Sequence, residues 1–285
     1  MRALGDRKAV SSDSLAVWRS RAVPGVVFHC GTRVSHPFPR HWHDELHLCA
    51  YTAGAGYMAC RGSSYLVGRG DLVITPPGEV HENWVESGAT VSFYSAYVDA
   101  SLLRNLIRDL NLDRKQGADF PSMFPRSPRL LSNFFRTYRA IQAGNTQLQC
   151  EEMLRDFLTL LMLHGRTDVT SRPRTLHDHT AVRRAREYID SHFTESISLA
   201  QLSRVTDFSP FHLQRIFFRQ TGLPPHAYQT QLRINRAKEL LRERQSLCDV
   251  AIKTGFADQS HLTRQFRRLV GVTPGRYAAE FNCAR

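Results

Sequence analysis

The order of apolar and polar positions divides the chain into a first part with strand-like alternation and a later part with helical spacing. From about residue 24 to residue 98, short alternating segments are separated by turn-forming groups such as Gly54-Ala55-Gly56 and Pro76-Pro77-Gly78. Short strands joined by tight turns are typical of a small sandwich or barrel. The first part is therefore predicted to be a β-domain.

After Ser101 the apolar residues recur three and four positions apart, which predicts helices over 102–110, 130–143 and 148–163. The third segment carries more apolar side chains than a single packing stripe requires. It either only covers the sheet or also forms part of a dimer interface, and the sequence leaves both possibilities open.

Residues 166–179 are rich in Thr, Ser, Arg, Pro and His and show no periodicity, which predicts a linker. We therefore expect a first domain over 1–165 and a second over 180–285. The expected fold is α+β, with a β-barrel and a helical dimerisation segment first, followed by an all-α domain.

Two stretches of the second domain repeat each other at a constant offset of 49 residues. The matched residues include core and surface positions alike: His212 with His261, Leu213 with Leu262, Arg215 with Arg264, Phe217 with Phe266, Arg219 with Arg268, Gly222 with Gly271, Pro225 with Pro274 and Tyr228 with Tyr277. So many coincidences at one spacing indicate a duplicated structural unit.

Each repeated stretch follows a short predicted helix, 199–206 or 247–254, and a tight turn. A short helix, a turn and a longer basic helix closed by glycine are the plan of a helix-turn-helix. Residues 228–244 predict a connecting helix of roughly 25 Å. Such a spacer could hold two recognition helices near the ~34 Å repeat of the major groove.

In each longer helix, Leu and Phe four residues apart face inward, so polar and basic residues fall on the opposite face. Gln and Arg can make bidentate contacts to base edges, whereas later arginines suit phosphate contacts. The candidate DNA-binding residues are Phe211, Gln214, Arg215 and Arg219 on the first helix, and Gln259, Ser260, His261, Thr263, Arg264 and Arg268 on the second.

The formal net charge of +12 is concentrated in the C-terminal part, where residues 166–285 hold 20 Lys and Arg against 11 Asp and Glu. A local basic excess favours a polyanionic partner such as double-stranded DNA. The six cysteines form no CxxC pair, so we expect reduced, mostly buried thiols. The start of the chain has no apolar export segment, and no apolar stretch could span a membrane, so we expect a cytoplasmic protein.

Residues 181–277 resemble the DNA-binding domain of AraC/XylS-type regulators, chiefly through the run from Gly255 to Arg268 and the run from Gly271 to Tyr277. The resemblance implies a seven-helix domain, two major-groove contacts and control of transcription by recruiting RNA polymerase, usually as an activator. One departure is Asp207, where the family usually has glycine. Because Asp tolerates the left-handed conformation, we expect little disruption.

The N-terminal half resembles the cupin-like sensor domain of such regulators, through His41-x-His43, Gly54 and the run from Gly70 to His81. If residues 40–51 form one strand, alternation places several polar groups on one face. These are His41, His43, Glu45, His47, Cys49 and Tyr51. Trp42 would lie on the opposite face, while Trp84, Tyr57 and Tyr65 could add aromatic walls.

Three roles remain open for His41, His43, His47 and His81. They could contact a small organic effector, act only structurally, or hold a divalent metal, because imidazole suits iron, nickel, copper and zinc. In metal-binding cupins two His, a Glu and a further His hold the ion; here His47 stands at the Glu position and His81 at the last His position. We expect no required cofactor and leave the metal as the alternative.

Together these features predict a sequence-specific, effector-responsive transcription regulator that acts as a homodimer and has no catalytic residues. An effector would enter the barrel, covered by the segment 1–21, and alter the arrangement of domains or protomers. Two alternatives remain: a ligand-independent DNA-binding protein whose first domain only dimerises, and a metal-dependent cupin enzyme fused to a DNA-binding domain.

Overall fold

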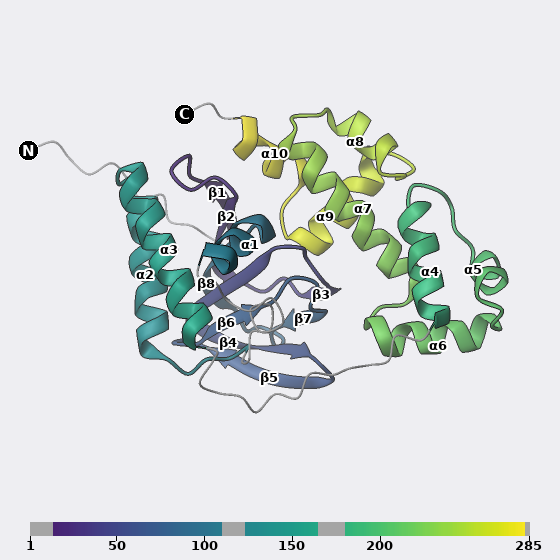
Figure 1. Ribbon diagram of the computed structural model, residues 1–285, viewed down its shortest axis with the longest axis horizontal. Coiled ribbons are helices and arrows are strands. Elements are labelled where there is room, and N and C mark those ends of the chain that lie inside the picture. The colour runs from purple at the N-terminus through teal and green to yellow at the C-terminus, as the bar shows by residue number, and fades with distance from the viewer. Residues whose placement is uncertain (1–13, 110–122, 165–179, 283–285) are drawn as a thin grey trace, which may run out of the picture.

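The computed structural model describes residues 14–109, 123–164 and 180–282, which form a sheet domain and a helical domain in contact with each other (Figure 1). The sheet domain ends at residue 164 and the helical domain begins at residue 180. The predicted linker, 166–179, lies outside the described residues. Within the described part, no helix is long and apolar enough to cross a membrane.

Eight strands form the antiparallel sheet in the order β1-β2-β8-β4-β7-β3, with β5 and β6 also paired to β4. Their bounds are β1 (Ser14–Arg19), β2 (Val26–Val34), β3 (Phe38–His41), β4 (Leu46–Cys60), β5 (Ser63–Gly68), β6 (Leu72–Thr75), β7 (His81–Trp84) and β8 (Val91–Val98). The long β4 pairs with four other strands, so the sheet curls around it. The predicted β-domain is confirmed.

The prediction of a covering arm at the start of the chain is wrong for the residues that the structure describes there. The segment 1–21 was expected to be a covering arm, but Ser14–Arg19 is an edge strand that pairs with β2 along its whole length. This strand reaches the helical domain, since Arg19 Nε donates to the carbonyl oxygen of Glu280 at 3.0 Å. Residues 1–13 lie outside the described part.

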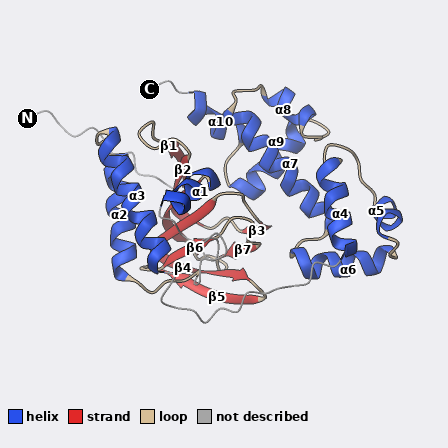
Figure 2. Cartoon of the chain, in the orientation of Figure 1, coloured by secondary structure: helices blue, strands red, loops and turns tan. Residues whose placement is uncertain are grey.

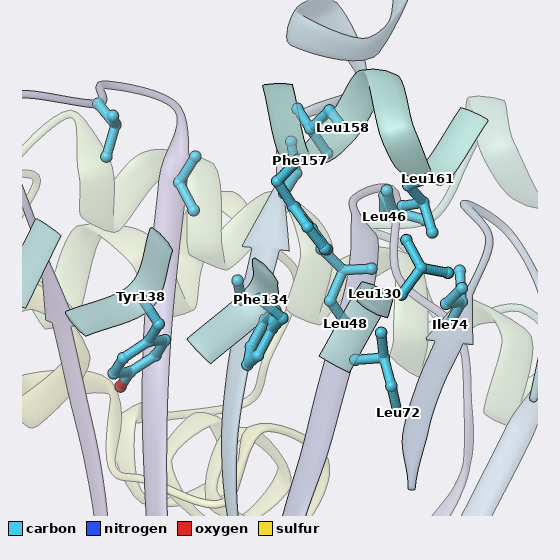
Figure 3. Close-up of a cluster of buried hydrophobic side chains, with 14 of the residues drawn as sticks. Leu46, Leu48, Leu72, Ile74, Leu130, Phe134, Tyr138, Phe157, Leu158 and Leu161 are labelled. Atoms are coloured by element: carbon cyan, nitrogen blue, oxygen red, sulfur yellow. The ribbon is translucent and has the colours of Figure 1, made fainter. Parts of the chain in front are cut away.

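Three helices cover one face of the sheet, as expected: α1 (Ala100–Asp109), α2 (Pro128–Gln142) and α3 (Gln147–His164). Alternate residues of the strands form the core with them, because successive side chains on a strand point to opposite faces. Figure 3 shows Leu46, Leu48, Leu72 and Ile74 of the strands facing apolar side chains of α2 and α3. Tyr138 closes this core by accepting a hydrogen bond from Trp18 Nε1 at 2.9 Å.

The helical domain contains seven described helices, as the family resemblance implied (Figure 2). They are α4 (Thr180–Ser191), α5 (Leu199–Thr206), α6 (Pro210–Thr221), α7 (Pro225–Arg242), α8 (Leu247–Lys253), α9 (Gln259–Val270) and α10 (Pro274–Asn282). We call α5 with α6 the first unit and α8 with α9 the second unit. Helix α7 connects the two units, as predicted.

The helices of the two units begin and end with corresponding cap residues. Ser198 and Ser246 cap the shorter helices, Ser209 and Asp258 cap the longer ones, and Gly222 and Gly271 end the longer helices in the left-handed conformation. Asp207 adopts φ 60° and ψ 24°, the same left-handed region as Gly255 at φ 74°. The expectation that aspartate tolerates this turn is confirmed.

The two domains share buried apolar surface. Leu15, Val17 and Val27 from β1 and β2 lie in one cluster with residues of α7 to α10, including Ile234 and Phe266. These strand residues point away from the face that carries α1 to α3. The helical domain therefore covers part of the inner face of the curled sheet.

The expectation for the cysteines is confirmed for the residues that the structure describes. Cys49, Cys60 and Cys150 are buried free thiols and Cys30 is half-buried, whereas Cys248 is exposed. Burial raises the pKa of the Cys49 thiol to about 12. Cys283 lies outside the described residues.

Candidate functional site

The longer helices of the two units bury corresponding faces and expose corresponding faces. Leu213 and Phe217 of α6 are fully buried, as are Leu262 and Phe266 of α9. The opposite side of each helix lies in solvent. Eight of the ten predicted DNA-binding residues are exposed: Phe211, Gln214, Arg215, Arg219, Gln259, Ser260, Arg264 and Arg268.

The other two predicted residues, His261 and Thr263, are half-buried. The His261 ring lies edge-on to Phe256, with centroids 5.2 Å apart, and the backbone N–H of His261 donates to the Asp258 cap at 2.6 Å. His261 therefore also supports the turn before α9. A base contact for any of the ten residues stays a prediction.

Both longer helices contact the sheet domain at their C-terminal ends. Gly222, at the end of α6, lies so close to Val80 that an added Cβ would meet that side chain at 2.9 Å. Gly271, at the end of α9, packs in the same way against Leu15. In helix-turn-helix proteins the N-terminal residues of the recognition helix contact base edges. The ends of α6 and α9 that would contact base edges are therefore opposite to the ends that contact the sheet domain.

A cavity of about 60 Å³ lies on the inner face of the sheet and is lined by His41, His47 and His81 together with Tyr97. A smaller adjoining cavity, of about 30 Å³, is lined by residues of both domains, among them His43 and Glu45 from the sheet domain. All four predicted histidines therefore line one or both of these neighbouring cavities, of which only the smaller is also lined by α7.

The predicted continuous strand over residues 40–51 is wrong. Strand β3 ends at His41 and β4 begins at Leu46, and the residues between them form a connection. His43 lines the smaller cavity from this connection, whereas His47, Cys49 and Tyr51 follow the alternation of β4 and line the larger one. Because the chain turns here, Glu45 leaves the expected face and points to the helical domain.

The histidine rings form a compact group. Ring centroids lie 4.3 Å apart for His41 and His81, 5.1 Å for His43 and His81, and 5.3 Å for His43 and His47. Nitrogens of His43, His47 and His81 all lie within 4.8 Å of one another. His41 lies beside this trio, and the His47 ring stacks on Tyr97 with centroids 4.2 Å apart.

These imidazoles are held in the neutral form. Burial, the main cause, lowers the pKa of His41 to about 4. Burial, with the neighbouring imidazoles adding to it, lowers the pKa of His43, His47 and His81 well below 6.5. His29, which the sequence did not single out, also lines the cavity, and burial lowers its pKa to about 3.

Glu45 links the connection between β3 and β4, which also carries His43, to helix α7. The sequence did not predict this contact. Lys238 Nζ donates to both carboxylate oxygens of Glu45 at 2.9 and 3.0 Å, and Arg242 Nη2 donates to one of them at 2.7 Å. Burial alone would raise the pKa of Glu45, but the two cations outweigh burial and hold it well below its usual value. The sequence did offer one sign of it: Lys238 and Arg242 lie four residues apart, which places two cations side by side on one face of a helix.

The predicted aromatic walls are present in part. Tyr57 and Trp84 stack at 5.5 Å and line the larger cavity. The prediction that Trp42 lies on the opposite side from the histidines is wrong. Its ring lies 6.0 Å from Tyr228 of the helical domain, and it lines the smaller cavity together with His41 and His43. Tyr65 is wrong as a wall residue, because it is exposed and packs on Phe124.

Comparison with protein families matches both halves of the chain. Residues 24–158 match the AraC-like ligand binding domain, and residues 202–280 match a helix-turn-helix domain. The uncharacterized HTH-type transcriptional regulator YbfI of Bacillus subtilis strain 168 is 29% identical over 233 residues, covering 80% of this chain and 82% of that protein. The arabinose operon regulatory protein of Escherichia coli K12 is 26% identical over 242 residues, covering 79% and 77%.

A solved structure shares the fold across both domains. The crystal structure of unsaturated fatty acid bound wild-type ToxT from Vibrio cholerae strain SCE256 aligns with a TM-score of 0.56 at 14% identity. The alignment covers 98% of this chain and 100% of that one.

Proposed function

Because this chain belongs to the AraC family of transcription regulators, we propose that a ligand in the histidine-lined cavities of the sheet domain controls how its two helix-turn-helix units bind DNA. The chain combines a ligand-binding domain with a DNA-binding domain, and the response to a small-molecule effector follows from this family. The finer assignments concern which residues contact DNA and how the cavity communicates with them.

The observation that carries the DNA-binding proposal is the pair of equivalent exposed faces on α6 and α9. Arg215 and Arg264 occupy matching positions, both are exposed, and arginine can bind guanine in the major groove through two hydrogen bonds. Each arginine projects from a helix whose opposite face is fully buried. We propose that these two helices enter successive major-groove segments on one face of the duplex.

The contact between Glu45 and α7 supports a route from the cavity to the DNA-binding units. His43 Nδ1 lies 2.7 Å from the backbone oxygen of Glu45, whose carboxylate holds Lys238 and Arg242 of α7. A ligand that moves the connection carrying His43 would therefore shift the attachment of α7. Control requires that the ligand bind the two arrangements with different affinity.

The small size of the larger cavity limits what can bind without such a movement. Its volume of about 60 Å³ is far below the roughly 300 to 1,000 Å³ of typical small-molecule sites. An organic effector of ordinary size would have to enlarge this space, and the smaller cavity next to it is bounded by α7. Enlargement on that side would reposition α7 as the effector binds.

We further propose that the protein acts in the cytoplasm as a homodimer and activates transcription by contacting RNA polymerase. Leu148 and Leu163, 65% and 48% exposed on α3, support a contact between two copies. The named relatives are transcription regulators, which favours regulation over catalysis. Sedimentation of the full chain tests the dimer, and promoter-driven transcription with purified polymerase tests activation.

Selection of duplex DNA from a random pool by the full chain tests the central proposal. We expect an enriched sequence with two conserved blocks about one helical turn apart, and affinity that falls steeply with salt. Arg264→Ala should remove the preference in one block and Arg215→Ala the preference in the other. Recovery of unenriched DNA, with equal binding by both variants, would overturn the assignment.

A further inference from the structure

We propose that His43, His47 and His81 form a binding site for one divalent late transition metal, of which Zn²⁺ is the representative. The inference deepens the proposed function, because it rests on the histidine-lined cavities being the ligand site and names an ion that this site takes. It follows from the orientation of two of the three imidazoles, the space between the three rings and the chemistry of their nitrogens.

The first observation is how the rings are oriented. Nδ1 of His43 lies 2.7 Å from the carbonyl oxygen of Glu45, and Nδ1 of His81 lies 2.9 Å from that of Glu79. A carbonyl only accepts, so in each neutral ring Nδ1 carries the proton and Nε2 keeps its lone pair. Metal-ligating histidines usually have such a backbone partner on the other nitrogen.

The second observation is an unsatisfied nitrogen. His43 Nε2 is fully buried and has no hydrogen-bond partner among the described residues, while the whole His43 side chain is only 4% exposed. Buried polar atoms without a partner are uncommon in folded proteins and call for an explanation such as an ion. A lone pair facing other imidazoles gains nothing from them unless a cation lies between.

The third observation is distance and space. The nitrogens of His43, His47 and His81 lie within 4.8 Å of one another, compared with roughly 3.4 Å between the ligands of a tetrahedral zinc ion. Small rotations of the side chains would close this difference. The larger cavity, of about 60 Å³ and lined by His47 and His81, leaves room for a water molecule on the ion.

The set of ligands indicates which class of metal is preferred. Three neutral imidazoles without a carboxylate suit zinc, nickel, copper and iron better than magnesium, calcium or manganese, which favour oxygen ligands. Glu45 supplies no ligand here, because Lys238 and Arg242 hold its carboxylate. With three protein ligands, a fourth position remains for water or for a group of an effector.

Direct binding of Co²⁺, a spectroscopic substitute for Zn²⁺, tests the site in the full-length chain prepared without a histidine tag and stripped with chelator. We expect visible d–d absorption that saturates at one equivalent and disappears when Zn²⁺ is added. Zn²⁺ should also raise the thermal unfolding temperature, because it binds the folded state. Absence of saturable absorption and of any thermal shift would overturn the proposal.

Two ligand variants and one matched control make the test specific. His81→Gln and His43→Gln should each weaken Co²⁺ binding by more than the roughly 10- to 100-fold that loss of an outer-shell partner costs. His192→Gln is the control, because its Nδ1 also lies 2.9 Å from a carbonyl oxygen, that of Tyr188, but at the end of α4. Circular dichroism establishes that each variant is folded, and if one ligand variant does not fold, the other decides.

The outcomes separate this inference from the proposed function. Retained Co²⁺ binding in both ligand variants, or equal loss in His192→Gln, would overturn the metal site while DNA selection remains unaffected. Stoichiometric metal binding by a chain that selects no DNA sequence would overturn the proposed function and leave the metal site standing.

Discussion

The first and second helix-turn-helix units have the same internal design but are attached to the sheet domain differently. The core of the second unit includes three buried strand residues, Leu15, Val17 and Val27. The core of the first unit is formed by the helical domain itself, and the sheet domain adds only half-buried neighbours, Trp42 and Val80. The second unit is therefore built into the interface, whereas the first lies at its margin.

This difference teaches that a duplicated unit can keep the same exposed face while its two copies take different structural roles. Lys238 and Arg242, which bind Glu45, lie in the half of α7 that packs against the second unit. We expect the second unit to stay fixed to the sheet domain and the first to move more easily. Mutations of matching positions can break or sharpen this comparison.

The largest effect is expected for Glu45→Ala, which leaves Lys238 and Arg242 without their shared carboxylate. Removing one partner of a buried charge pair costs about 3 to 5 kcal/mol, and urea unfolding of the full chain measures it. Glu239→Ala is the control, because Glu239 pairs with Arg236 at the exposed surface of the same helix. Equal losses for both variants would show that the second unit is not anchored through Glu45.

The next largest effect is expected for Gly255→Ala in the turn of the second unit. At φ 74°, an added Cβ would lie 2.1 Å from the carbonyl oxygen of Thr194, so strain and overlap together should cost about 2 to 4 kcal/mol. Thermal unfolding of the full chain measures the loss. A loss no larger than that of Asp207→Ala, in the first unit, would show that the second turn is not the more constrained of the two.

A smaller effect, on binding and not on stability, is expected for Arg264→Ala. The loss on the selected DNA sequence should be about 1 to 3 kcal/mol, with relaxed preference at one base pair. Fluorescence anisotropy with matched and altered duplexes measures both. Arg267→Ala, on the same exposed helix, should weaken binding to all sequences alike, and the same uniform loss for Arg264→Ala would assign that arginine to a phosphate.

The smallest effect is expected for Asp207→Gly, which gives the first turn the residue found in the second. Relief of the left-handed strain and the greater freedom of the unfolded chain oppose each other, so stability should change by less than about 1 kcal/mol. Urea unfolding measures the change. A larger loss would give the Asp207 carboxylate, 3.9 Å from Arg184, a structural role that its exposure argues against.

The helical domain could be predicted closely because its signals are local. Helix α5 spans the predicted residues 199–206, and the repeat located α6 and α9. Strand β1 could not be predicted, because its six residues are ordered by pairing with β2 and by contact with α10. A short segment of this kind takes its structure from tertiary contacts, which override propensity.

The candidate site could be predicted in composition but not in arrangement. The cupin-like motif identified the four histidines, and the structure brings them together. The strand assumed over residues 40–51 misplaced Glu45, since its partners lie more than 190 positions away on α7. The role of His29 was missed, because a single histidine in an apolar strand carries no signal of a shared cavity.

Helix α7 has a consequence for how such a regulator can diverge. The same helix fixes the separation of the two recognition helices and forms a wall of the adjoining cavity through Asn235 and Lys238. Under the proposed function, a substitution on this helix that changes the fit of a ligand would also bear on the separation of the two recognition helices. Ligand choice and the spacing of the two DNA contacts would then change together.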